Sequence, residues 1–215
     1  MRAQIAGVVL AGGRSRRMGG REKALIDLAG QPMLAHVLGR FAAQVGAVAI
    51  SANGDPARFA AFGLPVIADQ VPDHPGPLAG ILAALRWAAR LTPPVSRVAT
   101  VTSDAPFVPA DLVARLADAS AGAGAGIVVA HSGGRLHPVV GLWPLNIADD
   151  LACALATGER RVHRWVERKG ARSVDFARLE IGGRALDPFF NVNTPAELAE
   201  AETLMQLLEC HEARA

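Results

Sequence analysis

A glycine- and arginine-rich loop follows the first apolar segment of the chain. The stretch VVLAGGRSRRMGGREKAL, from Val8 to Leu25, leads from apolar residues into four glycines and five cations: Gly12, Gly13, Gly19 and Gly20 with Arg14, Arg16, Arg17, Arg21 and Lys23. Glycine lets backbone N–H groups approach an anion closely, and the cations would neutralise it. Neither G-x-x-x-x-G-K-[ST] nor G-x-G-x-x-G is present. The loop therefore predicts a polyphosphate site outside these two patterns, with a tight turn bearing solvated arginines as the alternative.

Lysine is scarce in this chain, and its presence at position 23 is therefore informative. Only Lys23 and Lys169 are lysines among the 22 basic residues. A chain so biased toward arginine tolerates arginine at most surface positions, so Lys23 indicates a site that needs a compact ammonium. A diffuse basic patch is the alternative, because runs of charge usually form solvated faces.

Four short apolar runs that suit buried strands each end in polar or glycine-rich sequence. Ligands bind at the carboxyl ends of the strands in an open α/β sheet, so the residues after these runs are expected to gather at one edge. The runs and the residues after them are Ile5–Leu10 with the Gly/Arg loop, Val48–Ala52 with Asn53, Pro65–Ala68 with Asp69, and Val98–Thr102 with Asp104. Local roles are the alternative: a cap for either aspartate, and a turn for Asn53 with Gly54.

Helical patterns alternate with these runs, and a hairpin interrupts the alternation. Helices are expected over Met33–Gln44, Pro56–Phe62, Pro77–Ala89, Pro109–Ala119, Asn146–Ala156 and Val162–Lys169. Ile127–His131 and Val139–Trp143 predict a hairpin around SGGR, and Ala121–Gly126 predicts a flexible turn. The capping box Thr194–Glu197, with proline at the first helical position, opens a last helix that runs to about Leu208. The pattern predicts one α/β domain over residues 1–215, a Rossmann-like three-layer fold with a mainly parallel sheet, helices on both faces and a small antiparallel insertion.

Composition narrows the class of protein. At 215 residues with a net charge of +2, the chain suits a single domain, and no apolar run approaches the roughly 20 residues that span a membrane. We see no secretion signal, and Cys153 and Cys210 lack C-x-x-C partners, which predicts a cytoplasmic protein. The six histidines lack metal-ligand spacing, so zinc is not expected. The basic loop has no interleaved aromatic residues, so nucleic-acid binding is not expected either.

The loop and five further segments together resemble one family of nucleotidyltransferases. The loop follows the pattern L-A-[AG]-G-x-[SGA]-x-R-[MF] with a downstream lysine, which is typical of the nucleotide-diphospho-sugar transferase fold. The further segments are ISANGD, VIADQVPDHPGPLAGI, SDAPFVPADL, FFNVNTPAEL and GERRV. On these segments, from about Val8 to Glu200, the chain resembles the molybdenum cofactor guanylyltransferases. Many relatives share the loop, whereas PGPLAG with NVNTP is more specific.

The resemblance implies a reaction and a set of site residues. Enzymes of this family transfer GMP from GTP to the terminal phosphate of molybdenum-bearing molybdopterin and release pyrophosphate. Carried over to this chain, the resemblance implies that the backbone of Leu10, Ala11 and Gly12 would contact the nucleotide and that Lys23 would bind its phosphates. Asn53 and Asp69 would place the nucleoside or base. Asp104 would bind Mg²⁺, and Asn191 and Asn193 would lie toward the pterin phosphate. Lys23 and Asp104 are expected to carry catalysis. The family often has Pro and Cys or Gly before the metal-binding aspartate, where this chain has Thr102 and Ser103.

Other interpretations stay open at this point. A cytidylyltransferase acting on the same pterin, or a sugar-1-phosphate nucleotidyltransferase, would share the loop. A non-catalytic protein that binds and delivers the pterin cofactor belongs to another class, although it would not need both Lys23 and Asp104. Asn191 and Asn193 could instead only order the chain before the cap at Thr194. We expect Mg²⁺ as the cofactor, GTP and molybdopterin as substrates, transient contacts with other molybdenum cofactor proteins, and a monomer.

Overall fold

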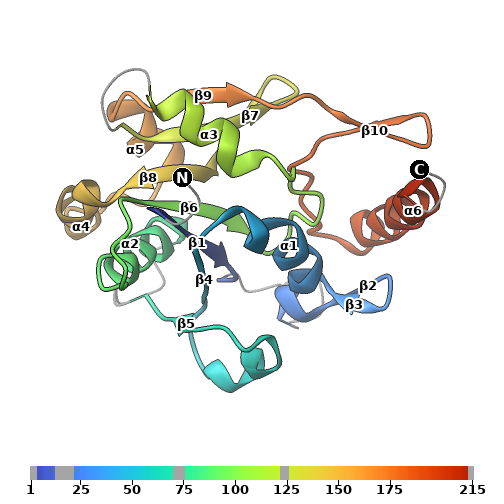
Figure 1. The fold of residues 1–215 in the computed structure, drawn as a ribbon, viewed down its shortest axis with the longest axis horizontal. Coiled ribbons are helices and arrows are strands. Elements are labelled where there is room, and N and C mark those ends of the chain that lie inside the picture. The colour runs from blue at the N-terminus through green and yellow to red at the C-terminus, as the bar shows by residue number, and fades with distance from the viewer. Residues whose placement is uncertain (1–3, 13–21, 70–75, 122–125, 213–215) are drawn as a thin grey trace.

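The chain folds around a seven-stranded sheet (Figure 1). The computed structural model describes residues 4–12, 22–69, 76–121 and 126–212. The strand order is β5-β4-β1-β6-β8-β7-β9, with β1 Ile5–Leu10, β4 Ala47–Ser51, β5 Val66–Ile67, β6 Arg97–Thr102, β7 Val128–Ser132, β8 Arg135–Pro144 and β9 Arg172–Asp175. In this sheet β8 runs antiparallel to β6 and β7, and the other pairs are parallel. The carboxyl ends of the six other strands therefore lie along one edge, together with the start of β8.

Helices cover both faces of this sheet, which gives three layers. The helices are α1 Met33–Phe41, α2 Pro77–Ala88, α3 Leu112–Ala121, α4 Ala148–Ala156 and α5 Val162–Arg168, with short 3-10 helices at η3 Lys23–Leu25, η4 Ala42–Gln44, η5 Pro56–Phe62 and η6 Leu145–Ile147. Val9 of β1 is buried in one core cluster with α1 and α3, whereas Val8 is buried in a second cluster with α2, α4 and α5. Neighbouring strand residues point to opposite faces, so one apolar strand serves both clusters.

A third cluster packs the last helix against two small hairpins. It contains α6 Pro195–Glu212, the β2–β3 hairpin (Asp27–Leu28 and Gln31–Pro32) and the β10–β11 hairpin (Leu179–Ile181 and Arg184–Leu186). Figure 1 shows α6 beside β10 at one end of the molecule, with α4 at the opposite end. Leu28, Ile181 and Leu204 are buried there with Phe107, which follows β6. No helix in the described ranges is long and apolar enough to cross a membrane.

The mainly parallel α/β fold expected from the sequence is confirmed, and one helix starts later than predicted. The strand predicted over Ile5–Leu10 has those bounds, and the β2–β3 and β10–β11 hairpins are small antiparallel additions. The helix predicted over Pro109–Ala119 begins only at Leu112. The side chain of Gln44 donates to the Pro109 carbonyl at 2.8 Å and accepts the Val113 N–H at 2.9 Å. A side chain from a distant part of the chain therefore caps α3, which no local pattern reveals.

Three strands in the last third of the chain were not predicted, and β8 starts at Arg135 rather than at Val139. β9 has no buried residue, and β10 and β11 have three residues each, so the apolar alternation that marks a strand is weak. Gly182 and Gly183 turn β10 into β11 with φ of 56° and 76°, as Gly133 and Gly134 do in the predicted hairpin. The glycine pair was therefore a usable signal. The core of the predicted turn Ala121–Gly126, residues 122–125, lies outside the described residues.

The predicted capping box at the start of α6 is present. Glu197 N–H donates to Thr194 Oγ1 at 3.2 Å, while the Glu197 carboxylate accepts from Thr194 Oγ1 at 3.0 Å and from the Asn193 N–H at 2.8 Å. The hydrogen bond from the Asn193 N–H is the largest of the effects that lower the pKa of Glu197 from 4.5. The pKa of Glu197 is lower in the folded state than in the unfolded state. The carboxylate therefore stabilises the fold at pH values above the unfolded-state pKa, and this stabilisation is lost as the pH falls through the folded-state pKa.

We expect Glu197→Gln to lower the thermal midpoint at neutral pH, because it removes the charge that the cap and the helix N-terminus favour. The difference between the two proteins should shrink as the pH falls below 4.5. Thermal unfolding followed by circular dichroism between neutral and acid pH measures it. Glu200→Gln is the control, since Glu200 is exposed in the same helix and lies 3.6 Å from Arg184. A Glu197→Gln deficit that stays constant down to acid pH would contradict the charge argument.

Candidate active site

The predicted nucleotide residues gather at the carboxyl edge of the sheet. Backbone hydrogen bonds continue one residue beyond the strands and hold their ends together: Ala11 N–H donates to Ser51 O at 2.8 Å, Ala52 N–H to Ile67 O at 3.0 Å, and Ser103 N–H to Leu10 O at 3.1 Å. Leu10 and Ala11 are buried, whereas Gly12 is exposed at the rim. The structure therefore brings the backbone of residues 10–12 beside the ends of β4 and β6, as the strand-end argument predicts.

Lys23 connects two of the other predicted residues. Its Nζ lies 2.5 Å from Asp104 Oδ2 and 2.6 Å from Asn193 Oδ1. The partners come from the end of β6 and from the segment before α6, 81 and 170 residues away in the chain. The Lys23 side chain is only 14% exposed and that of Asp104 19%, so the ion pair is partly shielded from water. Asn191 takes part through its carbonyl oxygen, which accepts from Asn193 Nδ2 at 3.2 Å.

Asp104 keeps one oxygen that suits a metal ion. The Asp104 carbonyl accepts the Val192 N–H at 2.9 Å, and Oδ2 faces Lys23. Oδ1 is buried and has no hydrogen-bond partner among the described residues. A buried carboxylate oxygen without a partner is unfavourable unless a cation or a ligand meets it. The described residues contain no group of three His, Cys, Asp or Glu side chains that could form an all-protein metal site. One carboxylate with substrate phosphates is the arrangement that Mg²⁺ uses, so Asp104 fits this ion.

Asn53 and Asp69 form a second connected pair at the same edge. Asn53 Nδ2 donates to Asp69 Oδ2 at 2.7 Å, and Asn53 Oδ1 accepts the Asp69 N–H at 3.0 Å. The two contacts set the orientation of both side chains where β4 and β5 end. The structure thus confirms that these residues lie together, while their role toward a nucleotide stays a prediction.

Some residues that hold the site together were not found from the sequence. Arg58 in η5 forms an ion pair with Glu22, the residue before Lys23, and donates to the Asn53 carbonyl. It therefore joins the segment of Lys23 to the end of β4. Gly80 has a similar positioning effect, because a Cβ there would lie 3.1 Å from the Leu10 side chain and 3.2 Å from Ser51 Oγ. Gly80 lets the first turn of α2 approach the strand ends closely. PGPLAG marked this turn as distinctive, whereas nothing in the spacing pairs Glu22 with Arg58.

The arginines of the loop, Arg14, Arg16, Arg17 and Arg21, lie outside the described residues, as do Gly13, Gly19 and Gly20.

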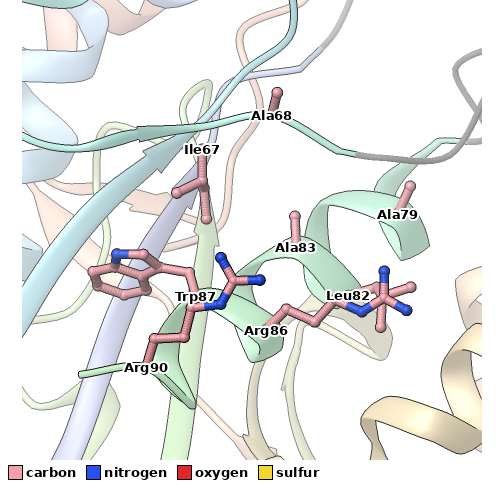
Figure 2. A pocket seen from close by; sticks show the side chains of 8 residues that line it. All are labelled: Ile67, Ala68, Ala79, Leu82, Ala83, Arg86, Trp87 and Arg90. Atoms are coloured by element: carbon pink, nitrogen blue, oxygen red, sulfur yellow. The ribbon is translucent and has the colours of Figure 1, made fainter.

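A cavity of about 180 Å³ lies apart from these site residues, between the end of β5 and α2 (Figure 2). Figure 2 shows Ile67 above the helix, with Arg86 and Trp87 in α2 and Arg90 just after its end. Its lining residues are Ile67, Ala68, Ala79, Leu82, Ala83, Arg86, Trp87 and Arg90, which include none of the predicted site residues.

Comparisons with known proteins give this geometry a family context. The MobA-like NTP transferase domain family matches residues 7–173. A molybdenum cofactor guanylyltransferase of Mesorhizobium japonicum is 49% identical over 207 residues, which cover 96% of this chain and 98% of that protein. The solved molybdopterin-guanine dinucleotide biosynthesis protein A of Archaeoglobus fulgidus has a TM-score of 0.70 at 23% identity, covering 94% of this chain and 98% of its own. A CMP:2-keto-3-deoxy-manno-octonic acid synthetase solved with CTP has a TM-score of 0.67 at 16% identity, covering 95% and 99%.

The two kinds of comparison carry different weight. The solved structures are too distant in sequence to show more than the nucleotidyltransferase fold, which proteins acting with different nucleotides share. The match to the guanylyltransferase of M. japonicum extends over nearly the full length of both chains. The chain therefore belongs to the MobA-like NTP transferase domain family, and within it to the molybdenum cofactor guanylyltransferases.

Proposed function

We propose that this protein transfers GMP from GTP to the terminal phosphate of molybdenum-bearing molybdopterin and releases pyrophosphate. The contact of Lys23 Nζ with Asp104 and Asn193 carries the proposal. It places a cation and a carboxylate from the nucleotide side of the site next to an amide expected at the pterin phosphate. The family of the chain supports the choice of nucleotide and acceptor, since its curated relatives are named for guanylyl transfer to this cofactor.

The reaction needs positioning and charge neutralisation rather than a covalent intermediate. An oxygen of the acceptor phosphate forms a bond to the α-phosphorus of GTP, and the bond from that phosphorus to the β-phosphate bridging oxygen breaks. The electron pair leaves on pyrophosphate. An ammonium has three N–H donors, so Lys23 can keep Asp104 and Asn193 and offer its third N–H to a phosphate oxygen. Lys23 would thereby offset the negative charge that grows on the leaving group.

Asp104 is the residue that would hold Mg²⁺, through the buried Oδ1 that lacks a partner among the described residues. When bound, the ion would neutralise the phosphates of both substrates and align them for in-line attack. Lys23 on Oδ2 keeps the carboxylate pointed toward the phosphates, and the backbone bond from Val192 fixes the Asp104 main chain. The residues around Asp104 thus support a magnesium-dependent transferase.

The pair of Asn53 and Asp69 would place the nucleoside or the base. Guanine donates from N1–H and from its 2-amino group, which suits carboxylate and carbonyl acceptors. Ala11 N–H is engaged with Ser51 O, so Ala11 would reach the nucleotide through its carbonyl oxygen. Adenine and cytosine lack this pair of neighbouring donors, which gives the site a physical basis for preferring GTP.

A cytidylyltransferase is the second candidate, because the synthetase solved with CTP shares the fold. A sugar-1-phosphate acceptor and a non-catalytic delivery protein remain the further alternatives. We also propose that residues 1–215 act as one domain and as a monomer in the cytoplasm. The protein would there meet other proteins of molybdenum cofactor synthesis transiently.

Pyrophosphate release with each nucleotide tests the proposed function. The protein is incubated with Mg²⁺, molybdenum-bearing molybdopterin and GTP, ATP or CTP in turn, and we expect turnover with GTP. In competition binding, GTP should be preferred over ATP and CTP by at least about tenfold, which corresponds to about 1.4 kcal/mol. Equal turnover with CTP would favour the cytidylyltransferase. Tight binding of nucleotide and pterin without pyrophosphate release would favour the delivery protein.

The chain offers a matched pair of lysines for testing the phosphate contact. Lys23→Ala should lower kcat/KM roughly a hundredfold, because it removes a charge-assisted contact in a partly shielded site. Lys169→Ala should change it by less than about twofold, since Lys169 forms an exposed ion pair with Asp150 at 2.7 Å. Lys23→Arg should recover only part of the activity, because a planar guanidinium is bulkier than an ammonium. If the lysine variants behave alike and added salt removes their differences, Lys23 belongs to a diffuse basic patch.

A further inference from the structure

The carboxyl edge continues beyond Asp104 into residues to which the proposed reaction gives no role. β8 lies next to β6, and β7 lies next to β8. Ser132 ends β7 and His137 stands near the start of β8, so both lie at the same edge as Asp104. In the β7–β8 ladder Ala130 pairs with His137 and Ser132 pairs with Arg135. Residues two apart in a strand share a face, so Ser132 and His137 lie on the same face of the sheet.

Two polar atoms at this place have no hydrogen-bond partner in the part of the chain that the structure describes. Ser132 Oγ and His137 Nε2 are buried and have no hydrogen bond to any described residue. Ser132 is fully buried, and His137 is 9% exposed. Buried polar side chains in proteins are nearly always hydrogen-bonded, so an unpaired pair of this kind indicates a place where a ligand or water binds. The mechanism proposed above uses neither group.

A carboxylate lies beside this imidazole. Asp187 Oδ2 is 3.6 Å from His137 Nε2, a distance beyond a hydrogen bond, and the Asp187 side chain is 28% exposed. Asp187 Oδ1 accepts the Phe189 N–H at 2.8 Å, and the His137 ring packs on Phe189 with 4.8 Å between the ring centroids. Burial lowers the pKa of His137, against the opposing effect of Asp187 and together with the charges of Arg135 and His131. Asp187 therefore faces a neutral imidazole near pH 7 and can accept hydrogen bonds from a ligand.

One short segment connects this cluster to Lys23. It begins at Asp187, buries Phe189 and Val192, and ends at Asn193. The Val192 N–H donates to the Asp104 carbonyl, and Asn193 Oδ1 accepts from Lys23. A ligand lying along this segment would meet Asp104 and Asn193 at one end and Asp187 with His137 at the other.

The position fits the second substrate rather than the nucleotide. Guanine and pterin contain the same 2-amino-4-oxopyrimidine ring, in which an amine and a ring N–H donate side by side, and a carboxylate accepts such a pair. Asp69 follows β5, three strand spacings or roughly 14 Å from β6, whereas β8 is the immediate neighbour of β6 on the other side. Resting on the proposed function, we propose that Asp187 and His137 bind the aminopyrimidinone ring of the pterin acceptor, whose phosphate lies toward Asn193 and Asp104.

Direct binding of a pterin separates this proposal from the nucleotide site. The probe is a 6-substituted pterin monophosphate, followed by quenching of its own fluorescence, and GTP binding is measured on the same samples. Asp187→Asn can still accept the Phe189 N–H but replaces one acceptor oxygen with a donor. This variant should bind the pterin at least about tenfold more weakly than the wild type, and the KM of the acceptor should rise by a similar factor. Its affinity for GTP should stay within about twofold of the wild-type value.

Asp175→Asn is the matched control. Asp175 ends the neighbouring strand β9 and pairs with His131 at 2.6 Å, and its variant should bind the pterin like the wild type. His137→Gln keeps a hydrogen-bonding group and should bind the pterin more tightly than His137→Leu. The proposal is overturned if Asp187→Asn binds the pterin as the wild type does, or if it weakens GTP and leaves the pterin unchanged. A wild-type protein that turns over another acceptor and does not bind the pterin overturns the proposed function itself.

Discussion

The contact of one ammonium with two oxygens organises this site. Lys23 Nζ meets Asp104 at the end of the central strand β6 and Asn193 just before the last helix. A guanidinium would need more room and a planar arrangement of acceptors, which explains why a chain rich in arginine has a lysine here. The contact requires that the loop after β1, the end of β6 and the segment before α6 come together. The third core cluster brings the end of β6 and the segment before α6 together, because it buries Phe107 and Val192 with residues of α6.

Strand order divides the edge into two halves around β6. The parallel strands β1, β4 and β5 lead to the residues expected to bind the nucleotide. Asn53 and Asp69, which follow β4 and β5, are joined by two hydrogen bonds. The antiparallel strand β8 with β7 brings a different set of groups to the other side of Asp104. An in-line transfer needs the attacking oxygen of the acceptor phosphate opposite the leaving pyrophosphate at the α-phosphorus, so the acceptor must approach from outside the nucleotide. The change from parallel to antiparallel pairing at β6 thus coincides with the boundary between the two substrates in this account.

Much of the nucleotide half could be predicted because it depends on local signals. Short apolar runs that end in Asn53, Asp69 and Asp104 identify parallel strands, and parallel strands align their carboxyl ends. The contact of Lys23 with Asn193 could not be read from spacing, since it joins residues 170 positions apart through packing of a separate cluster. In the sequence, His137 is one of six histidines without metal-ligand spacing, and nothing else distinguishes it. Its significance lies in a buried nitrogen without a partner among the described residues, which is a property of the folded chain alone.

The most direct test of the account is the dependence of the pyrophosphate release rate on Mg²⁺ concentration in Asp104→Asn, compared with the wild type at saturating GTP and acceptor. The asparagine keeps the size of the side chain, so the thermal midpoint should stay near that of the wild type. We predict that the maximal rate falls roughly a hundredfold, because the variant lacks the carboxylate proposed to hold the ion. An unchanged maximal rate with the same Mg²⁺ dependence would contradict the central role given to Asp104.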